Sequence, residues 1–307
     1  EVIRTPAISQ HVTRKFGFGD LGLRSFPFHL RELSKLCGAS HPSAFSLQPS
    51  AFPKIDAILI PGPPWYPFCL GPIIKRRFGV PYVLDYIDPW VDSLGAAARP
   101  LSKAWMAHRA ALLLERPSAT GAARIVAVSE ETHLMVQRRY PEIPAKHCVA
   151  IPYGCEPSDF DALRQEGKPP THLASFKENI NLCYVGAMLP KAYGTLRTLF
   201  RAIREVRESH PRGNRVRIHF LGTTYAVGPA AKPLVLPVAF EEKVGDVVTE
   251  HPERISYLEA LRLLLSADLN LALGSSEPHY PASKIFPGLL AGRPLLALLT
   301  KRAAYVP

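Results

Sequence analysis

The stretch "INLCYVGAMLPKAYGTLRTLFRAIREVRESHPRGNRVRIHFLGTT" (residues 180–224) decides the fold class. Residues 180–188 form a short apolar run that predicts a buried strand, and residues 215–224 predict a second one. Residues 193–211, between them, have the pattern of a long amphipathic helix. Two strands joined by a crossover helix form a parallel pair, so the stretch predicts a βαβ unit.

The same alternation of strand and helix extends over most of the chain. Strands are predicted at 55–63, 80–88, 123–128, 146–154, 269–275 and 293–300, and helices at 66–79, 100–118, 129–141, 257–268 and 280–292. This pattern predicts an α/β protein with parallel sheets covered by helices on both faces. The polar stretch 161–178 contains Gly and Pro and interrupts the pattern, which predicts a linker. We therefore expect domains at 1–165 and 179–307, joined by a linker at 166–178.

Composition limits the classes of partner. Hydrophobic residues make up 47% of the 307, and the net charge is +11, which favours acidic ligands such as phosphates. The basic residues are scattered, which argues against nucleic acid as a partner. Five cysteines without CxxC spacing are typical of a reducing compartment, so a cytoplasmic location is expected. Charged residues and prolines interrupt each apolar stretch that approaches the length of a membrane span.

Four short motifs, in order, resemble those of the GT-B-fold glycosyltransferases of the large family four. They are a strand ending in Val-Ser-Glu at 128–130, an "IPYG" turn at 151–154, a Val-Gly pair at 185–186 and "AGRPLLAL" at 291–298. The resemblance implies two Rossmann-like domains that face a cleft. It also implies an acceptor-side first domain and a second domain that binds a nucleotide sugar. Both ends of the chain are expected to be shorter than in that family.

The resemblance also marks departures from the family pattern. The paired glutamates of the family align with His279 and Pro287, and Glu277 lies close by but out of register. The family's Arg after the Val-Gly strand aligns with Ala187, while its Lys has a shifted candidate in Lys191. The donor sugar is therefore left open. A subset of the family has a Ser-Lys pair at the start of the late helix, as Ser283 and Lys284 do here.

Asp88 is the candidate catalytic residue. It ends the predicted strand in "VPYVLDYIDPWVDS" (residues 80–93), where the resemblance places an acceptor-side His or Asp. A carboxylate there could orient an acceptor hydroxyl or take its proton. A cap on the following helix is an equally good interpretation. Asp85, three positions earlier, would face the other side of the strand and pair with a basic neighbour.

Ser283 and Lys284 are the candidates for binding the diphosphate of the donor. A helix starting near Pro281 would offer free N–H groups, to which Lys284 adds a full charge. An exposed lysine on a solvated surface is the ordinary alternative. Gly186 would allow a ligand to approach the backbone, and Lys191 could contact phosphate.

The remaining candidates follow from the resemblance. Ile255 and Tyr257 match the segment that seats the nucleotide base, while helix packing is the alternative for Tyr257. Glu277, His279 and Tyr280 belong to the loop beside the donor sugar, although His279 could equally be a loop residue without a ligand.

The sequence therefore predicts transfer of a sugar from a nucleotide diphosphate donor to a glycan or lipid-linked acceptor. The resemblance implies a metal-independent, retaining enzyme without a cofactor. The helix at 102–114 carries Lys103, His108 and Arg109 beside apolar residues, so a peripheral contact with an anionic membrane at its inner face is also expected. A solvated helix face is the more ordinary interpretation of the same residues. The alternatives are a non-catalytic nucleotide-sugar-binding protein and a sugar-nucleotide epimerase on the same fold.

Overall fold

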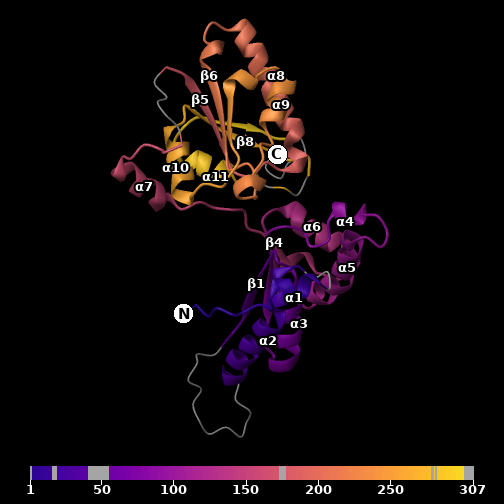
Figure 1. Cartoon of the computed structure of the whole chain (residues 1–307). Coiled ribbons are helices and arrows are strands. Elements are labelled where there is room, and N and C mark those ends of the chain that lie inside the picture. Colours follow the sequence, from indigo (N-terminus) through magenta and orange to yellow (C-terminus); the bar gives the residue numbers. More distant parts are fainter. Residues whose placement is uncertain are drawn as a thin grey trace. The chain divides into compact units, whose positions relative to one another are not determined.

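We describe the protein from a computed structural model that defines residues 2–15, 19–40, 55–172, 178–277, 280 and 282–300. Contacts divide the chain into two compact units, Glu1–Pro152 and Tyr153–Pro307. Each unit contains one parallel sheet (Figure 1). The α/β fold with two Rossmann-like domains is therefore confirmed.

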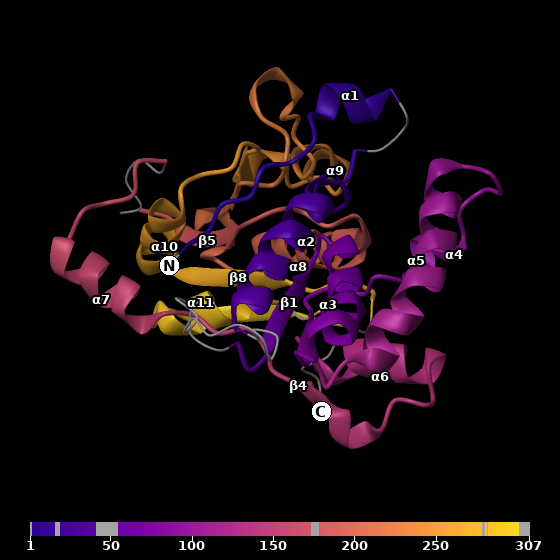
Figure 2. The same ribbon diagram turned by 90° about the horizontal axis from the view of Figure 1, so that it is seen from below.

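The first unit has a four-stranded sheet in the order β1-β2-β3-β4. Its strands are β1 (Ile58–Gly62), β2 (Tyr82–Tyr86), β3 (Arg124–Ala127) and β4 (Cys148–Ala150). Its helices are α1 (Gln10–Arg14), α2 (Leu21–Ser40), α3 (Leu70–Phe78), α4 (Ser93–Ala96), α5 (Lys103–Gly121) and α6 (Glu130–Arg139), with short 3-10 turns at Tyr66–Cys69 and Ala145–His147. The sequence pattern did not predict α2, which lies beside α3 in both ribbon views (Figures 1 and 2).

Local signals explain where two of these helices begin and end. Gly79 ends α3 with a φ of 72°, a left-handed conformation that costs glycine little. Ser129 caps α6 at the start of the helix predicted for 129–141, because its side chain accepts a hydrogen bond from the N–H of Thr132. The Val-Ser-Glu motif therefore marks the passage from β3 into α6.

The two faces of the first sheet differ. On one face, Ile60, Leu84 and Ile125 are buried against Phe68 and Ala111. On the other face, Leu59 is 62% exposed and Val149 is 45% exposed, while residues between them are half-buried. The prediction of helices on both faces is therefore wrong for this sheet, as far as the described ranges extend.

The second unit has a five-stranded sheet in the order β7-β6-β5-β8-β9. Its strands are β5 (Ile180–Val185), β6 (Val216–Leu221), β7 (Val248–His251), β8 (Leu269–Leu273) and β9 (Leu295–Leu298). Its helices are α7 (Pro157–Glu166), α8 (Tyr193–Ser209), α9 (Leu236–Glu241), α10 (Tyr257–Ser266) and α11 (Ile285–Leu290), with 3-10 turns at Pro190–Ala192, Gly213–Arg215, Gly228–Ala230 and Gly245–Val247. Figure 1 shows α8 and α9 on one side of the sheet and α10 and α11 on the other.

The predicted βαβ unit is present as β5, α8 and β6. The apolar stripe of α8, formed by Leu196, Leu199, Phe200 and Ile203, packs on β5 and β6. Burying each such side chain contributes roughly 1.5–3 kcal/mol, so the stripe holds the helix on the sheet.

The boundary between the units lies earlier than the sequence predicts. Contacts separate the units after Pro152, whereas the expected linker covers 166–178. The reason is α7, whose Phe160 and Leu163 are buried against Leu261 and Leu264 of α10. A helix packed in this way belongs to the second unit.

Candidate functional site

The carboxyl end of β5 brings two predicted residues together. Gly186 follows the strand with a φ of 128°, and its N–H donates to the carbonyl of Leu221 at 2.8 Å. A Cβ placed on Gly186 would lie 2.5 Å from Cε of Lys284. Gly186 is therefore needed because the stem of Lys284 crosses directly over it.

The ammonium group of Lys284 occupies a partly desolvated position. Its Nζ lies 5.1 Å from the centroid of the Tyr184 ring. Burial, and next the charge of Arg254, lower the pKa of Lys284 to about 8. Within the residues that the structure describes, Lys284 has no carboxylate partner. A cation held in this way favours an anionic ligand.

Arg254 supplies a second cation that the sequence analysis missed. It lies between β7 and α10, and its guanidinium carbon is 4.8 Å from the centroid of the Tyr225 ring. Its Cα lies 3.8 Å from a Cβ built on Gly222, at the end of β6. Recognising β7 at 248–251 would have identified Arg254, because the carboxyl ends of parallel strands share one edge of a sheet. Lys284 and Arg254, with Gly186, are called the Lys284 site below.

A cavity of about 560 Å³ adjoins the Lys284 site. Its walls include Tyr257, Ser283, Lys284 and the buried Asn270. The amide of Asn270 donates to the carbonyl of Leu264 at 3.1 Å, while its Oδ1 accepts no hydrogen bond from any described residue. The mostly apolar lining and the few polar groups fit an organic ligand beside the two cations.

Tyr257 has a different environment from the one predicted. It is 55% exposed, and its hydroxyl donates to Oδ2 of Asp159 on α7 at 2.9 Å. That hydrogen bond is the main reason that the pKa of Tyr257 rises to about 12. The ring therefore joins α10 to α7 at the cavity wall, and the half-buried Ile255 lies in the segment before α10.

Lys191 and Glu277 form an ion pair. Their charged atoms are 2.6 Å apart, and the N–H of Tyr280 donates to the carbonyl of Glu277 at 3.2 Å. Lys191 is thus compensated by a carboxylate, unlike Lys284. His279 lies outside the described residues.

The helix after the donor loop is shorter than predicted. It begins at Ile285 and has six residues, so Ser283 and Lys284 lie in the turn that precedes it. The N–H of Phe286 donates to the carbonyl of Ser283 at 3.3 Å. A helix this short contributes little dipole, and the ammonium of Lys284 carries the charge of the site.

Asp88 lies just beyond β2 in the first unit, and its side chain is exposed. The interpretation as a helix cap is wrong, because Asp92 accepts the N–H of Gly95 at 2.6 Å and so caps α4. The predicted ion pair of Asp85 is also wrong for the described part of the chain, where no basic group pairs with it. Burial raises the pKa of Asp85.

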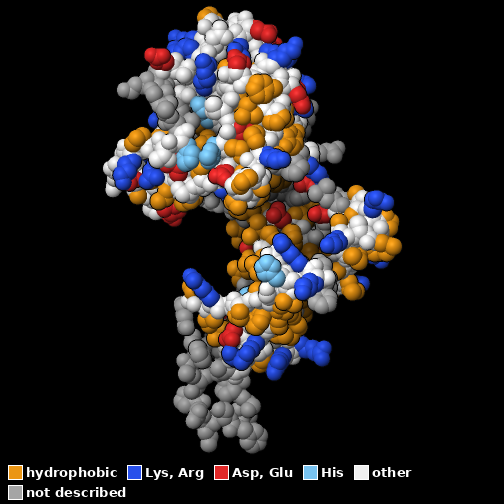
Figure 3. All heavy atoms as spheres, in the orientation of Figure 1, with side chains coloured by type: hydrophobic (Ala, Val, Ile, Leu, Met, Phe, Trp, Pro, Cys, Tyr) orange, Lys and Arg blue, Asp and Glu red, His pale blue; other side chains and the backbone are white. Residues whose placement is uncertain are grey.

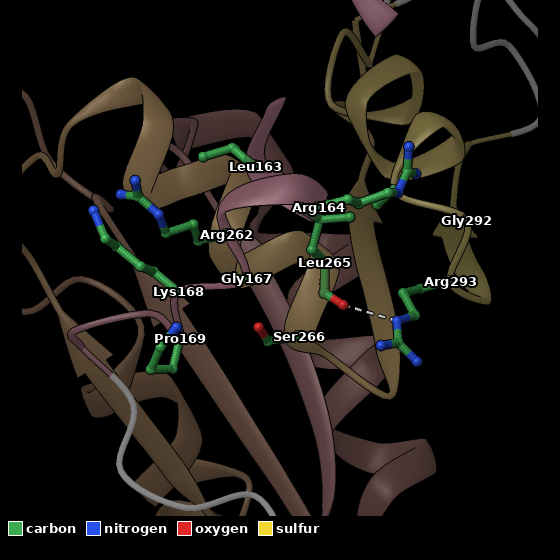
Figure 4. Close-up of a pocket in the computed structure, with 11 residues that line it drawn as sticks. Leu163, Arg164, Gly167, Lys168, Pro169, Arg262, Leu265, Ser266, Gly292 and Arg293 are labelled. Atoms are coloured by element: carbon green, nitrogen blue, oxygen red, sulfur yellow. Dashed lines mark hydrogen bonds between the residues drawn. The ribbon is translucent and has the colours of Figure 1, made fainter. Parts of the chain in front are cut away.

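A second cavity, of about 500 Å³, also collects basic residues (Figure 4). Arg164, Lys168, Arg262 and Arg293 line this basic cavity at the ends of α7, α10 and α11. Arg262 pairs with Glu166 at 2.6 Å, and Lys168 pairs with the same carboxylate. Arg164 pairs with Asp161 at 2.9 Å, and Nε of Arg293 donates to the carbonyl of Leu265 at 2.8 Å.

Comparison with protein families finds a similarity in the first unit. Residues 9–154 match the model of the glycosyl transferase 4-like domain, which is less than half of the 307 residues. The first unit is therefore similar to that domain. The resemblance to GT-B glycosyltransferases drawn from the four motifs is thereby confirmed. Asp88 lies within the matched residues, whereas the Lys284 site lies beyond them.

Solved structures confirm the GT-B fold of the chain as a whole. Anabaena HepE, solved with UDP and glucose, has a TM-score of 0.51 at 16% identity, covering 86% of this chain and 62% of its own. The UDP-forming α,α-trehalose-phosphate synthase of Burkholderia xenovorans has a TM-score of 0.55 at 11% identity, covering 92% and 65%. A trehalose-6-phosphate protein of E. coli, bound to UDP-2-fluoro glucose, has a TM-score of 0.57 at 14% identity, covering 92% and 65%.

This chain therefore spans less than two thirds of the length of these structures. No curated protein sequence matches it significantly. Within the described ranges of both units, no helix is long and apolar enough to cross a membrane. In the same ranges, no group of three or more His, Cys, Asp or Glu side chains could hold a metal ion.

Proposed function

We propose that the chain transfers a sugar from a nucleotide diphosphate donor to an acceptor hydroxyl. The observation that carries the proposal is the Lys284 site, where two cations without a described carboxylate partner lie at the carboxyl ends of β5 and β7. Ligands of open parallel sheets bind at this edge. Complexes of HepE with UDP and glucose and with UDP-glucose support a nucleotide-sugar donor.

The donor diphosphate would bind between Lys284 and Arg254. The charge of Arg254 lowers the pKa of Lys284, so the two cations repel one another when no anion is present. A diphosphate would relieve this repulsion, and it would be neutralised as it departs from the sugar. The adjoining cavity of about 560 Å³ would take the nucleoside, with Tyr257 and Ser283 in its wall, and Ile255 would contact the base from the segment before α10.

The sugar would lie toward the loop that contains Glu277 and Tyr280. In this arrangement the Lys191–Glu277 pair fixes the loop, and the Glu277 carboxylate can also accept a sugar hydroxyl. We propose transfer without a metal ion or other cofactor, with retention of configuration. Charge on the leaving diphosphate is then stabilised by Lys284 and Arg254 alone.

Asp88 would receive the acceptor hydroxyl, a glycan or lipid-linked group. It is an exposed carboxylate at the carboxyl end of β2, in the domain that the family resemblance assigns to the acceptor. We expect Asp88→Asn to lower transfer by at least about a hundredfold, the lower range for a positioned acid–base group, while leaving nucleotide affinity unchanged. Asp85→Asn, on the same strand, should change stability and leave turnover intact.

The experiment measures UDP or GDP affinity by calorimetry, and sugar transfer to extracted lipids and glycans, for the wild type and both variants. Nucleotide binding without donor turnover would favour the non-catalytic binding protein. Full turnover in Asp88→Asn would remove Asp88 from the reaction. An epimerised sugar nucleotide as the product would favour the epimerase.

A peripheral membrane contact through α5 is a further part of this proposal. Met106 is 52% exposed and Leu113 is 75% exposed on that helix, and Lys103 and Arg109 are exposed beside them. Exposed apolar side chains next to cations suit the interface of an anionic bilayer. On the face drawn in Figure 3, Lys and Arg side chains are spread over both units rather than gathered in one band, and such scattering does not suit nucleic acid. Sedimentation with anionic and with neutral vesicles would test the contact, and equal binding to both would reject it.

A further inference from the structure

Glu115 is a buried carboxylate that the proposed reaction does not use. It lies in the middle of α5 and has no exposed surface. Its Oε2 accepts from Nη1 of Arg139 at 2.5 Å and from the hydroxyl of Tyr140 at 3.0 Å. A buried charge requires such compensation, and among the described residues Arg139 is the cation that supplies it.

The same guanidinium reaches the segment that follows β2. Nη2 of Arg139 donates to the backbone carbonyl of Val91 at 3.0 Å. Val91 is 5% exposed and lies three residues after Asp88. The planar fork of arginine can serve two acceptors in fixed directions, which the single ammonium of lysine cannot do.

Contacts from the other side hold the same segment, residues 87–92. Nε1 of Trp65 donates to the backbone carbonyl of Asp88 at 3.2 Å. The N–H of Ile87 donates to the carbonyl of Gly62 at 3.1 Å, and the Trp90 ring lies 5.9 Å from the Phe68 ring. The backbone is thus fixed from both directions while the Asp88 side chain remains exposed.

We infer that Arg139 is a positioning residue for Asp88: held by buried Glu115, it fixes segment 87–92 through the Val91 carbonyl. This inference rests on the proposed function, in which Asp88 receives the acceptor. Glu115 orients Arg139 from α5, and Arg139 transmits that orientation from the end of α6 to the segment. Fixing the segment places the carboxylate before the acceptor arrives.

Arg139→Lys tests the inference with little risk to folding, because lysine keeps the charge that Glu115 requires. Arg138→Lys is the matched control, since Arg138 is the preceding residue and pairs on the surface with Glu131 at 2.6 Å. We expect Arg139→Lys to lower kcat by about tenfold to a hundredfold, the effect of a small misplacement, with donor Kd unchanged. Backbone hydrogen exchange should rise in 87–92 and stay unchanged in β3. The Arg138→Lys variant should leave kcat, the donor Kd and the hydrogen exchange of 87–92 unchanged.

The double variant separates positioning from general stability. In an Asp88→Asn background, Arg139→Lys should cost no further activity, because residues that act through one group are not additive. The inference would be overturned if Arg139→Lys lowered activity equally in the wild-type and Asp88→Asn backgrounds. It would also be overturned if the hydrogen exchange of 87–92 did not change. A wild-type chain that transfers no sugar would reject the proposed function instead, and the exchange result would still decide whether Arg139 holds the segment.

Discussion

The second unit contains two groups of basic side chains that differ in how their charges are compensated. In the basic cavity, Arg164 and Arg262 pair with carboxylates, and Arg293 donates to a backbone carbonyl (Figure 4). In the Lys284 site, the described residues provide no carboxylate for Lys284 or Arg254. The basic cavity has more cations, yet Arg164, Lys168 and Arg262 already pair with carboxylates.

The position of each group explains the difference. The basic cavity lies where α7, α10 and α11 end, and unpaired carbonyls at helix C-termini attract cations without any ligand. The Lys284 site lies at the carboxyl edge of the sheet, where aromatic rings replace carboxylates as neighbours. Uncompensated charge in a partly desolvated place, rather than the number of basic residues, therefore indicates an anion site.

The largest expected effect follows removal of the Lys284 charge. Lys284→Ala should weaken UDP or GDP binding by about 1.5–3 kcal/mol, typical of a lost charge-assisted hydrogen bond. Titration calorimetry of the folded variant gives the value. If the variant binds every nucleotide as tightly as the wild type does, the diphosphate lies elsewhere.

The pH dependence of binding should be the next largest effect. The pKa of Lys284 is lowered to about 8, so its ammonium is present at pH 7 and mostly lost at pH 9. A bound diphosphate favours the charged form, so nucleotide affinity should fall about tenfold between these pH values. The Lys284→Arg variant should bind the nucleotide with equal affinity at pH 7 and at pH 9. An affinity that rises with pH in the wild type would contradict the assignment.

Arg254 should contribute less, because its side chain is exposed and solvent screens its charge. Arg254→Ala should weaken nucleotide binding only about threefold to fivefold, and less at high salt. The variant should also raise the pH at which binding is lost, since it removes a cation that lowers the pKa of Lys284. An unshifted pH profile would mean that the two cations do not interact.

The smallest effect on binding is expected in the basic cavity. Arg262→Ala should leave nucleotide affinity within about twofold of wild type, while the melting temperature falls because Glu166 loses one of its partners. Calorimetry and thermal melting on the same sample separate the two results. A loss of affinity equal to that of Lys284→Ala would remove the distinction between the two groups.

Short-range signals were sufficient for much of the fold. The period of the apolar residues predicted β5, α8 and β6, and Ser129 and Gly79 predicted two helix ends that the structure confirms. The same signals missed α2 and most of α7. In α7, a polar surface and a Gly at its end suggested a linker, whereas Phe160 and Leu163 hold it on α10.

The residues of the candidate site likewise divide into those that the sequence predicted and those that it missed. The sequence predicted Gly186 and Lys284 as site residues, the first at a strand end and the second at a helix start, but their direct contact joins residues about a hundred positions apart. Arg254 was missed because β7 was not recognised. Lys191 was selected as a possible phosphate contact and Glu277 as a residue of the donor loop, and their pairing appeared only in the structure.

The sequence by itself determined the α/β class and the parallel strands, and with them the sheet edge where a ligand is expected, because apolar periodicity and turn residues act over a few positions. Tertiary structure decided which charges are compensated. Glu115 and Lys284 each stand in a local sequence that would suit a solvated surface, yet one is fully buried beside Arg139 and the other lies over Tyr184. Burial and pairing depend on what the rest of the chain brings within a few ångströms, and these distances set the energy of a charge.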